Sequence, residues 1–326
     1  MDVGFAAFTD VALQGPFSAG PYRFSAINGD GVPFQWSVSV GPRPGGLRFL
    51  VDCGVPGTSI SARLAHTRDL LARLEAGGVL RYNQEGLDRA LAFLLPAPHL
   101  LDTSLMGVWL AGALLRDGTT HLKVYVNARV GEVAPRYYRF GACLAAHGRM
   151  LAVERLAALV ASVGERIVPV ATAFDLTDCG VGRFKMYFRL REGDPAVLVA
   201  AANALGQPDA QPMLTLLRRL LTLGGDYPAG AVVFSAEFPE AEHAGDLKVD
   251  VNTALTLSSD AEADRRIRAL IAAIGLADDE YRDMRDIVVG SCAIKDVRQL
   301  LFVGLALRAR ETRVNVYMHP CPTEPM

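Results

Sequence analysis

The chain has 326 residues, of which 51% are hydrophobic and 21% are charged, and its formal net charge is −2. This composition allows a sizeable buried core and excludes global disorder. The near-neutral charge gives no sign of a nucleic-acid surface, so an anionic ligand would have to meet a local cluster of cations.

Targeting and cysteine signals are weak. The five cysteines are scattered and form no CxxC pair, which favours reduced, mostly buried thiols over a disulfide framework or a zinc site. The N-terminal residues lack a basic region followed by a long apolar run, as a secretory signal would have. No apolar stretch reaches transmembrane length. We therefore expect a soluble, cytoplasmic protein with no membrane or nucleic-acid partner.

Five pairs of alternating polar and apolar segments predict five β-hairpins. In chain order they cover 33–40 with 47–51, 105–115 with 122–130, 168–176 with 184–190, 232–238 with 247–253, and 301–307 with 314–318. Helical periodicity separates them over 58–76, 84–95, 140–165, two runs within 195–223, 260–274 and 279–285. The predicted unit is therefore two strands followed by helices, five times over.

The second strand of each hairpin has one apolar and one polar face. Lys123, Lys185 and Lys248 recur at intervals of 62 and 63 residues on the polar face. The polar face also carries further cations and three tyrosines, namely Arg48, Arg183, Tyr125, Tyr187 and Tyr317. In an open sheet this face would lie flat in water. Closing the sheet removes both edges and turns the polar face into a lumen wide enough for ligands.

We therefore predict an α+β barrel of ten antiparallel strands around a polar lumen, with an outer ring of helices. Residues 1–326 would form a single domain of five ββα repeats.

An ordered set of motifs resembles the diphosphate-binding pattern of the soluble aromatic prenyltransferases, which have the ABBA or prenyltransferase-barrel fold: Arg48, Lys123-x-Tyr125 and Arg183-x-Lys185-x-Tyr187. The chain is most similar to the cyanobactin-type peptide prenyltransferases of this superfamily. That similarity lies within a repeat architecture over residues 24–319, in the passages 107–130, 173–190 and 302–317.

The resemblance implies a role for each set. The cations, with Lys248, would bind the diphosphate of an isoprenoid donor and stabilise the charge left on it as the allylic C–O bond breaks. The tyrosines would surround the allyl cation, each favouring positive charge by about 0.5–2 kcal/mol, and exclude water. A Mg²⁺ ion bound mainly by the diphosphate would need few protein carboxylates, and no protein metal site is predicted.

Two lumen positions depart from the family pattern and are the candidate catalytic residues. Gln35 stands where the family commonly has a glutamate, and an amide can orient an acceptor but is not a base. Asp250 replaces a tyrosine of the other repeats. With Asp52, Asp250 could act as an acid or base or bind a cationic acceptor, or it could simply pair with Lys248.

Other candidates have plainer explanations. The acidic stretch that begins at Asp278 resembles a magnesium motif of isoprenyl synthases only superficially, and a helix N-terminus accounts for it better. His121 and His319 share parity with the lumen residues and could shuttle a proton or be structural. For Trp36 and Trp109, core packing is favoured over stacking on an acceptor.

We therefore expect a prenyltransferase that moves a dimethylallyl or geranyl group from its diphosphate to a Trp, Tyr or Arg side chain of a ribosomally made, cyclic peptide. The alternatives are an indole or aromatic prenyltransferase that acts on small molecules, and a non-catalytic barrel that binds an anion.

Overall fold

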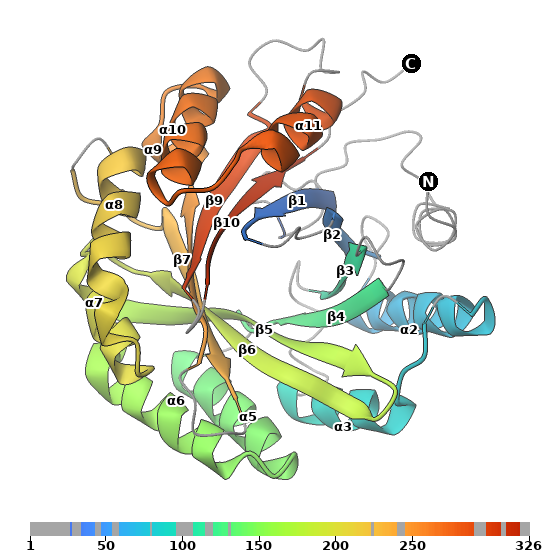
Figure 1. The fold of residues 1–326 in the computed structure, drawn as a ribbon. Coiled ribbons are helices and arrows are strands. Elements are labelled where there is room, and N and C mark those ends of the chain that lie inside the picture. Colours follow the sequence, from blue (N-terminus) through green and yellow to red (C-terminus); the bar gives the residue numbers. More distant parts are fainter. Residues whose placement is uncertain are drawn as a thin grey trace.

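The structure is a computed structural model, and it describes residues 27, 34–42, 47–53, 59–78, 80–95, 107–114, 120–129, 132–222, 225–239, 245–289, 298–307 and 311–319. Ten antiparallel strands close into one barrel in which each strand pairs with its neighbours in the chain and β1 pairs with β10 (Figure 1). The strands are β1 Phe34–Val40, β2 Leu47–Asp52, β3 Val108–Leu114, β4 Thr120–Asn127, β5 Ile167–Thr177, β6 Gly180–Leu190, β7 Val232–Phe238, β8 Leu247–Asn252, β9 Leu300–Leu307 and β10 Thr312–Met318.

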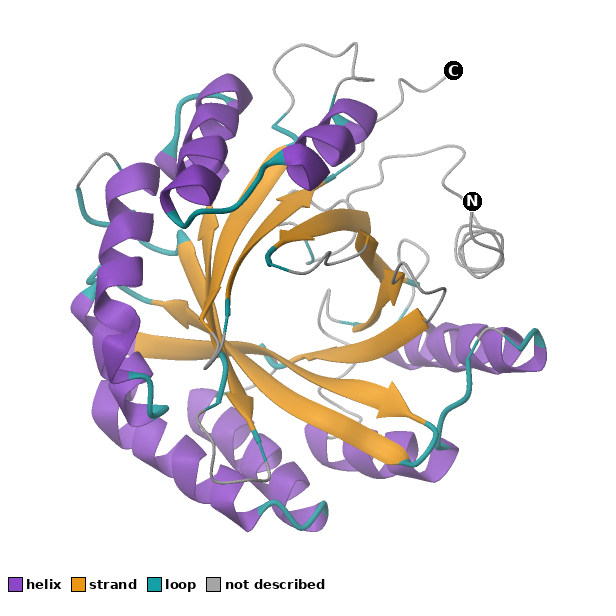
Figure 2. Ribbon diagram, in the orientation of Figure 1, coloured by secondary structure: helices purple, strands orange, loops and turns teal. Residues whose placement is uncertain are grey.

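Helices surround the barrel on the outside (Figure 2). They are α2 Ile60–Ala76, α3 Gln84–Leu94, α5 Val133–Ala146, α6 Met150–Val163, α7 Ala196–Ala204, α8 Gln211–Leu221, α9 Thr253–Thr256, α10 Asp260–Ala273 and α11 Asp279–Val288. Short 3₁₀ turns occupy Gly164–Arg166 and Pro208–Ala210. The predicted α+β barrel with an outer helical ring is therefore confirmed.

Alternate strand residues point to the outer face of the sheet, and these residues are apolar. Phe184 and Phe188 of β6 and Phe238 of β7 are fully buried between sheet and helices. The ring of Phe140 in α5 packs against that of Phe238, with centroids 5.4 Å apart. Each such burial contributes about 1.5–3 kcal/mol, so the helices are held on the sheet by its apolar face.

The segment predicted as one helix over 140–165 is wrong in two respects. The structure has two helices there, because Gly148 adopts φ +74° and ends the run between them. The first helix also begins earlier, at Val133. Pro135 lies in its first turn, where a missing backbone N–H removes no hydrogen bond.

The third hairpin is tighter than the pattern indicated. β6 begins at Gly180 rather than at Phe184, and Thr177 pairs with Gly180 across the turn. Gly180 has φ +143°, a conformation open to glycine but strained for other residues.

The other predicted strands and helices agree with the structure in the residues that it describes. Asp278 precedes α11, and Asp279 and Glu280 stand in its first turn, so the helix N-terminus expected there is confirmed. Helices come after four of the five hairpins, and the residues from 320 onward, beyond β10, lie outside the described part of the chain. The predicted turn at Asp117-Gly118 also lies outside it. That residues 1–326 form a single domain stays a prediction.

Candidate active site

The two strands of each hairpin contribute different kinds of side chain to the lumen. The second strands carry the long polar side chains, and the first strands carry small residues opposite them. Lys123 pairs with Ala111, Lys185 with Ala173 and Lys248 with Ser235, and Gly304 and Ala306 continue the pattern on β9. The small residues keep the barrel hollow, so the long side chains reach into open space.

Two adjoining cavities, which share lining residues such as Tyr125 and Tyr187, occupy the lumen. The first, the cation chamber, has a volume of about 450 Å³, and six of its described lining residues are cationic: Arg48, Lys123, Arg183, Lys185, Lys248 and Arg313. All five cations that the sequence predicted are therefore brought together, and Arg313 is a sixth that the pattern did not single out.

Carboxylates from neighbouring strands partly neutralise the cation chamber. Asp175 Oδ1 lies 3.2 Å from Lys123 Nζ, and its Oδ2 accepts a hydrogen bond from Arg183 Nε at 2.7 Å. Glu237 Oε2 lies 3.2 Å from Lys185 Nζ and 3.6 Å from an Arg183 guanidinium nitrogen. Neither acid was predicted as a site residue, although the alternation of β5 and β7 places both on the lumen face.

Burial shifts the protonation of these groups. Burial lowers the pKa of Lys123 to about 7. Repulsion from Lys185 and Arg183 adds to this effect, and attraction to Asp175 opposes it only in part. Burial likewise lowers the pKa of Lys185, against the attraction of Glu237. For Asp175, burial alone would raise the pKa, but Lys123 and Arg183 hold it below its usual value.

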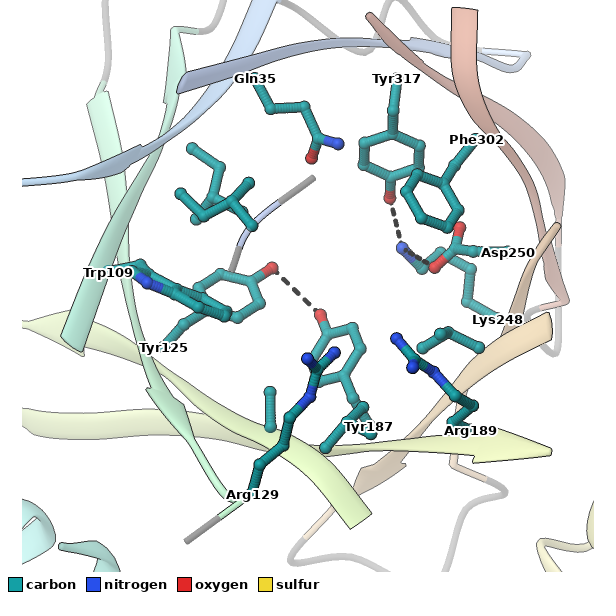
Figure 3. A pocket seen from close by; sticks show the side chains of 15 residues that line it. Gln35, Trp109, Tyr125, Arg129, Tyr187, Arg189, Lys248, Asp250, Phe302 and Tyr317 are labelled. Atoms are coloured by element: carbon teal, nitrogen blue, oxygen red, sulfur yellow. Dashed lines mark hydrogen bonds and ion pairs between the residues drawn. The ribbon is translucent and has the colours of Figure 1, made fainter. Parts of the chain in front are cut away.

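Three tyrosines and one lysine form a waist between the two cavities (Figure 3). The hydroxyls of Tyr125 and Tyr187 are hydrogen bonded at 3.0 Å. Lys248 Nζ donates to the Tyr317 hydroxyl and lies 4.8 Å from that ring's centroid and 5.8 Å from that of Tyr187. Burial raises the pKa of Tyr317 to about 12, so the ring faces the waist as a neutral phenol. The three predicted tyrosines therefore converge.

The second cavity, the aromatic chamber, has a volume of about 130 Å³ beyond the waist. Besides the waist residues it is lined by Trp109, Phe302, Arg129, Arg189, Asp250 and Gln35. Both arginines escaped sequence analysis, although Arg189 follows Tyr187 at the same alternation.

The two candidate catalytic residues face this aromatic chamber. Asp250 is 6% exposed, and its Oδ2 lies 2.7 Å from Lys248 Nζ, so the ion-pair alternative for this residue describes the geometry. Burial raises the pKa of Asp250 in spite of the lysine. For Lys248, burial alone would lower the pKa, but Asp250 raises it above the ordinary value. Gln35 is 6% exposed and lines both chambers.

Asp52 is a structural residue. Its Oδ2 lies 3.1 Å from Arg63 Nη1 and accepts a hydrogen bond from Trp109 Nε1 at 3.2 Å. Trp109 is buried, as expected for core packing, and its ring also lines the aromatic chamber. Trp36 does pack among aromatic residues, 4.7 Å from the Phe34 ring.

The two candidate histidines lie in different environments. His121 lines the cation chamber, whereas His319 is buried and its carbonyl accepts a hydrogen bond from the Gln299 side chain.

Metal-ligand clusters and membrane-spanning helices are absent from the described ranges. No group of three or more His, Cys, Asp or Glu side chains there could hold a metal ion. Asp175 and Glu237 are each paired with cations, which fits them poorly for Mg²⁺, and Asp246 also lines the cation chamber. None of the helices described is long and apolar enough to span a bilayer.

Comparison with known proteins places the fold. No protein-family model matches the chain, and a search of curated proteins found no match. The prenyltransferase PriB superposes with a TM-score of 0.80 at 20% identity, over 100% of this chain and 94% of PriB. The fold is that of the ABBA prenyltransferases.

Other structures share the ABBA fold. A 6-dimethylallyltryptophan synthase from Micromonospora olivasterospora has a TM-score of 0.77 at 20% identity, over 98% of this chain and 95% of that one. AnaPT from Neosartorya fischeri has a TM-score of 0.68 at 15% identity, over 92% and 80%. PriB is known in complex with L-tryptophan and dimethylallyl thiolodiphosphate, and the Micromonospora enzyme with DMASPP and Trp.

Proposed function

We propose that this protein is a prenyltransferase that moves a dimethylallyl group from its diphosphate to an aromatic acceptor. The observation that carries the proposal is the cation chamber, which opens directly onto a waist of three neutral tyrosines. The donor carries a strongly anionic diphosphate next to an allylic carbon. It therefore needs a cationic environment and a neutral aromatic environment side by side. The complexes of PriB and of the Micromonospora enzyme with donor analogues support the same assignment.

In the first step, the diphosphate would bind among Arg48, Lys123, Arg183, Lys185 and Lys248. The allylic C–O bond then breaks, and both electrons leave with the diphosphate. Charge-assisted hydrogen bonds strengthen as this negative charge develops, so the cations favour ionisation. A Mg²⁺ ion carried by the diphosphate stays a prediction of the resemblance.

The allyl cation would form at the waist, against the faces of Tyr125, Tyr187 and Tyr317. Aromatic faces stabilise a cation by about 0.5–2 kcal/mol each. Neutral phenols do this without offering an anionic oxygen that could capture the cation. The closed wall also keeps out water, which would otherwise give the prenyl alcohol.

The acceptor ring would lie in the aromatic chamber, and one of its carbons would attack the cation. Asp250 is the carboxylate of this chamber, so we assign it as the acceptor of the proton released when the ring regains aromaticity. Its raised pKa makes it a stronger base than an exposed aspartate. Gln35 would orient the acceptor through its amide, since it has no basic oxygen at neutral pH.

The finer acceptor prediction, a Trp, Tyr or Arg side chain of a ribosomally made cyclic peptide, stays a proposal beside the small-molecule alternative. The named tryptophan complexes of the structural neighbours favour an indole acceptor.

Incubation with dimethylallyl and geranyl diphosphate tests the function. The acceptors are L-tryptophan, L-tyrosine and cyclic peptides that contain Trp, Tyr or Arg, with products identified by mass spectrometry and diphosphate measured separately. We expect an aromatic acceptor to gain one five-carbon unit per diphosphate released. Binding of the donor without diphosphate release for any acceptor would favour the non-catalytic barrel instead.

A further inference from the structure

The cation chamber holds carboxylates side by side with its lysines, and the register of the sheet puts them there. Lys123 of β4 stands directly across from Asp175 of β5, and Lys185 of β6 stands directly across from Glu237 of β7. On its other side each of these lysines faces an alanine. The two acids therefore lie on the inner face of the barrel, at the same level as the lysines.

Ion pairs extend this matching to most of the chamber. Among the six described cations that line it, the sixth, Arg48, donates to the amide oxygen of Asn315 at 3.3 Å. The other five lie within 3.2 Å of a carboxylate oxygen, and the pairs are Lys123 and Arg183 with Asp175, Lys185 with Glu237, Lys248 with Asp250, and Arg313 with Glu311. The positive charge of the chamber is thus largely compensated by acids of the chain itself.

Glu237 is the acid that is most directly opposed to an anionic ligand. It is 8% exposed, and its Oε2 meets Lys185 and Arg183 without accepting a well-aligned hydrogen bond in the described part of the chain. Burial alone would raise the pKa of Glu237, but Lys185 and Arg183 hold it below its usual value, so the carboxylate is charged at neutral pH. Its cations are held by charge and not by directed bonds.

A diphosphate bound among these cations would lie close to the same carboxylates. Like charges at such short distances repel strongly in a partly buried site, because water screens them poorly there. The diphosphate must therefore replace Asp175 and Glu237 as the partner of Lys123, Lys185 and Arg183. Binding of the donor is then an exchange of anions, and the affinity is the difference between two large attractions.

The exchange matters most after the reaction. Breaking the allylic C–O bond leaves one more negative charge on the diphosphate than the donor carried. Cations without acids beside them would hold this product more tightly than the donor, and its release would then limit turnover. Acids that take the cations back oppose this outcome.

We propose that Glu237 and Asp175 compete with the diphosphate for the cations of the chamber, so that they weaken its binding and speed its release. This inference rests on the proposed function and names the residues that set how long the product stays in that site. The two acids act through Lys123, Lys185 and Arg183 and do not contact the reacting carbon.

A purely structural role for the acids predicts the opposite sign. If Glu237 served to hold Lys185 and Arg183 in place for the donor, or to keep Lys185 protonated, its loss would weaken the binding of diphosphate. The sign of the change in affinity therefore decides between the two roles.

Calorimetry with inorganic diphosphate measures this affinity without any turnover. The whole protein is titrated at about pH 6.5, below the pKa of Lys123 at about 7, and without divalent cations that would compensate the ligand. Glu237→Gln keeps the size of the side chain and removes its charge, so the Kd of diphosphate should fall about 10-fold. Asp175→Asn should change it in the same direction. Glu237→Asp keeps the charge and should stay within about threefold of the wild type.

Steady-state kinetics give a second measurement, with Glu154→Gln as the control because Glu154 is exposed on α6. In Glu237→Gln the donor KM and the inhibition constant of diphosphate should both fall about 10-fold. The kcat should fall as well, and the prenylated product should appear in a burst before a slower steady phase, because release has become slow. The control should match the wild type in each value.

Thermal unfolding checks that the variants are folded. Lys185 loses its carboxylate in Glu237→Gln, so this variant should unfold at a lower temperature than the wild type and gain more than the wild type does when diphosphate is added. Asp175→Asn provides the same test if Glu237→Gln does not fold.

Two outcomes would overturn the inference: unchanged or weaker binding of diphosphate in the folded variants, or tighter binding with neither a lower kcat nor a burst. Failure of the proposed function would look different. Glu237→Gln would then still bind diphosphate more tightly in the calorimeter, but no form of the protein would prenylate any acceptor.

Discussion

The carboxylate of Asp250 occupies the space in which a side chain of Gly304 would begin. The two residues are paired across β8 and β9, and a Cβ at position 304 would overlap Asp250 Oδ1. Gly304→Ala should therefore turn the carboxylate away and break its ion pair with Lys248. We expect product formation to fall about tenfold and stability to fall by about 1–3 kcal/mol, the usual effect of overpacking. Steady-state kinetics and thermal unfolding measure the two effects.

Gly141→Ala is the matched control for this change. Gly141 lies within α5, and the nearest atom to an added Cβ there is Leu156 Cδ2 at 3.9 Å. This substitution should leave the kinetics unchanged and stabilise the helix by about 0.5–1 kcal/mol. If Gly304→Ala behaved like Gly141→Ala, the position of Asp250 would be irrelevant to the reaction.

Asp250→Asn separates ionisation of the donor from loss of the proton. The amide keeps the shape of the side chain but cannot accept a proton, so prenylated product should fall by about 100-fold or more, in the range of general base catalysis. Diphosphate release should fall much less, because the cation chamber is intact and water can capture the cation. Parallel assays of diphosphate, prenyl alcohol and prenylated acceptor measure this ratio. A proportional loss of all three products would show that Asp250 serves the donor and not the proton.

The fold was largely predictable because its signal is local. The alternation of polar and apolar residues in a strand can be read from successive positions. Five hairpins at regular spacing can then close into a barrel in only a few ways. The same alternation, extended along β6 by two residues from Tyr187, reaches Arg189, so half of the arginine pair was within reach of sequence analysis. The carboxylate partners Asp175 and Glu237 lie on first strands, where the polar alternation is weaker than on the second strands that carry the cations.

Other features of the site depend on distances that no local pattern encodes. The pairing of β9 with both β8 and β10 brings Lys248 to the waist beside Tyr317, 69 residues away along the chain. The orientation of Trp109 likewise follows from its bond to Asp52, 57 residues away. Residue type and alternation indicate which side chains enter the lumen, but the tilt and stagger of the strands decide which of them meet.

Lys185→Ala should abolish donor turnover but also destabilise the protein. Lys185 and Glu237 are each 10% exposed in their side chains, so removing the lysine leaves a buried carboxylate with Arg183 as its more distant partner. We expect a loss of about 1–3 kcal/mol. The double variant Lys185→Ala with Glu237→Gln removes that unpaired charge and should regain most of the stability while staying inactive. Recovery of activity along with stability in the double variant would contradict a role for Lys185 in holding the diphosphate.

The lowered pKa of Lys123 makes donor binding depend on pH in a definite direction. Below pH 7 the lysine carries its charge in the free protein, and above pH 7 it has lost its proton and must regain it when the diphosphate binds. For the donor, kcat/KM should therefore fall above pH 7, by up to about tenfold per pH unit for uptake of one proton. Calorimetry in buffers of different ionisation enthalpy should detect that proton. Lys123→Arg keeps its charge throughout this range and should flatten the profile between pH 7 and 9, which controls for titration of the diphosphate itself. An unchanged slope in this variant would assign the pH dependence to another group.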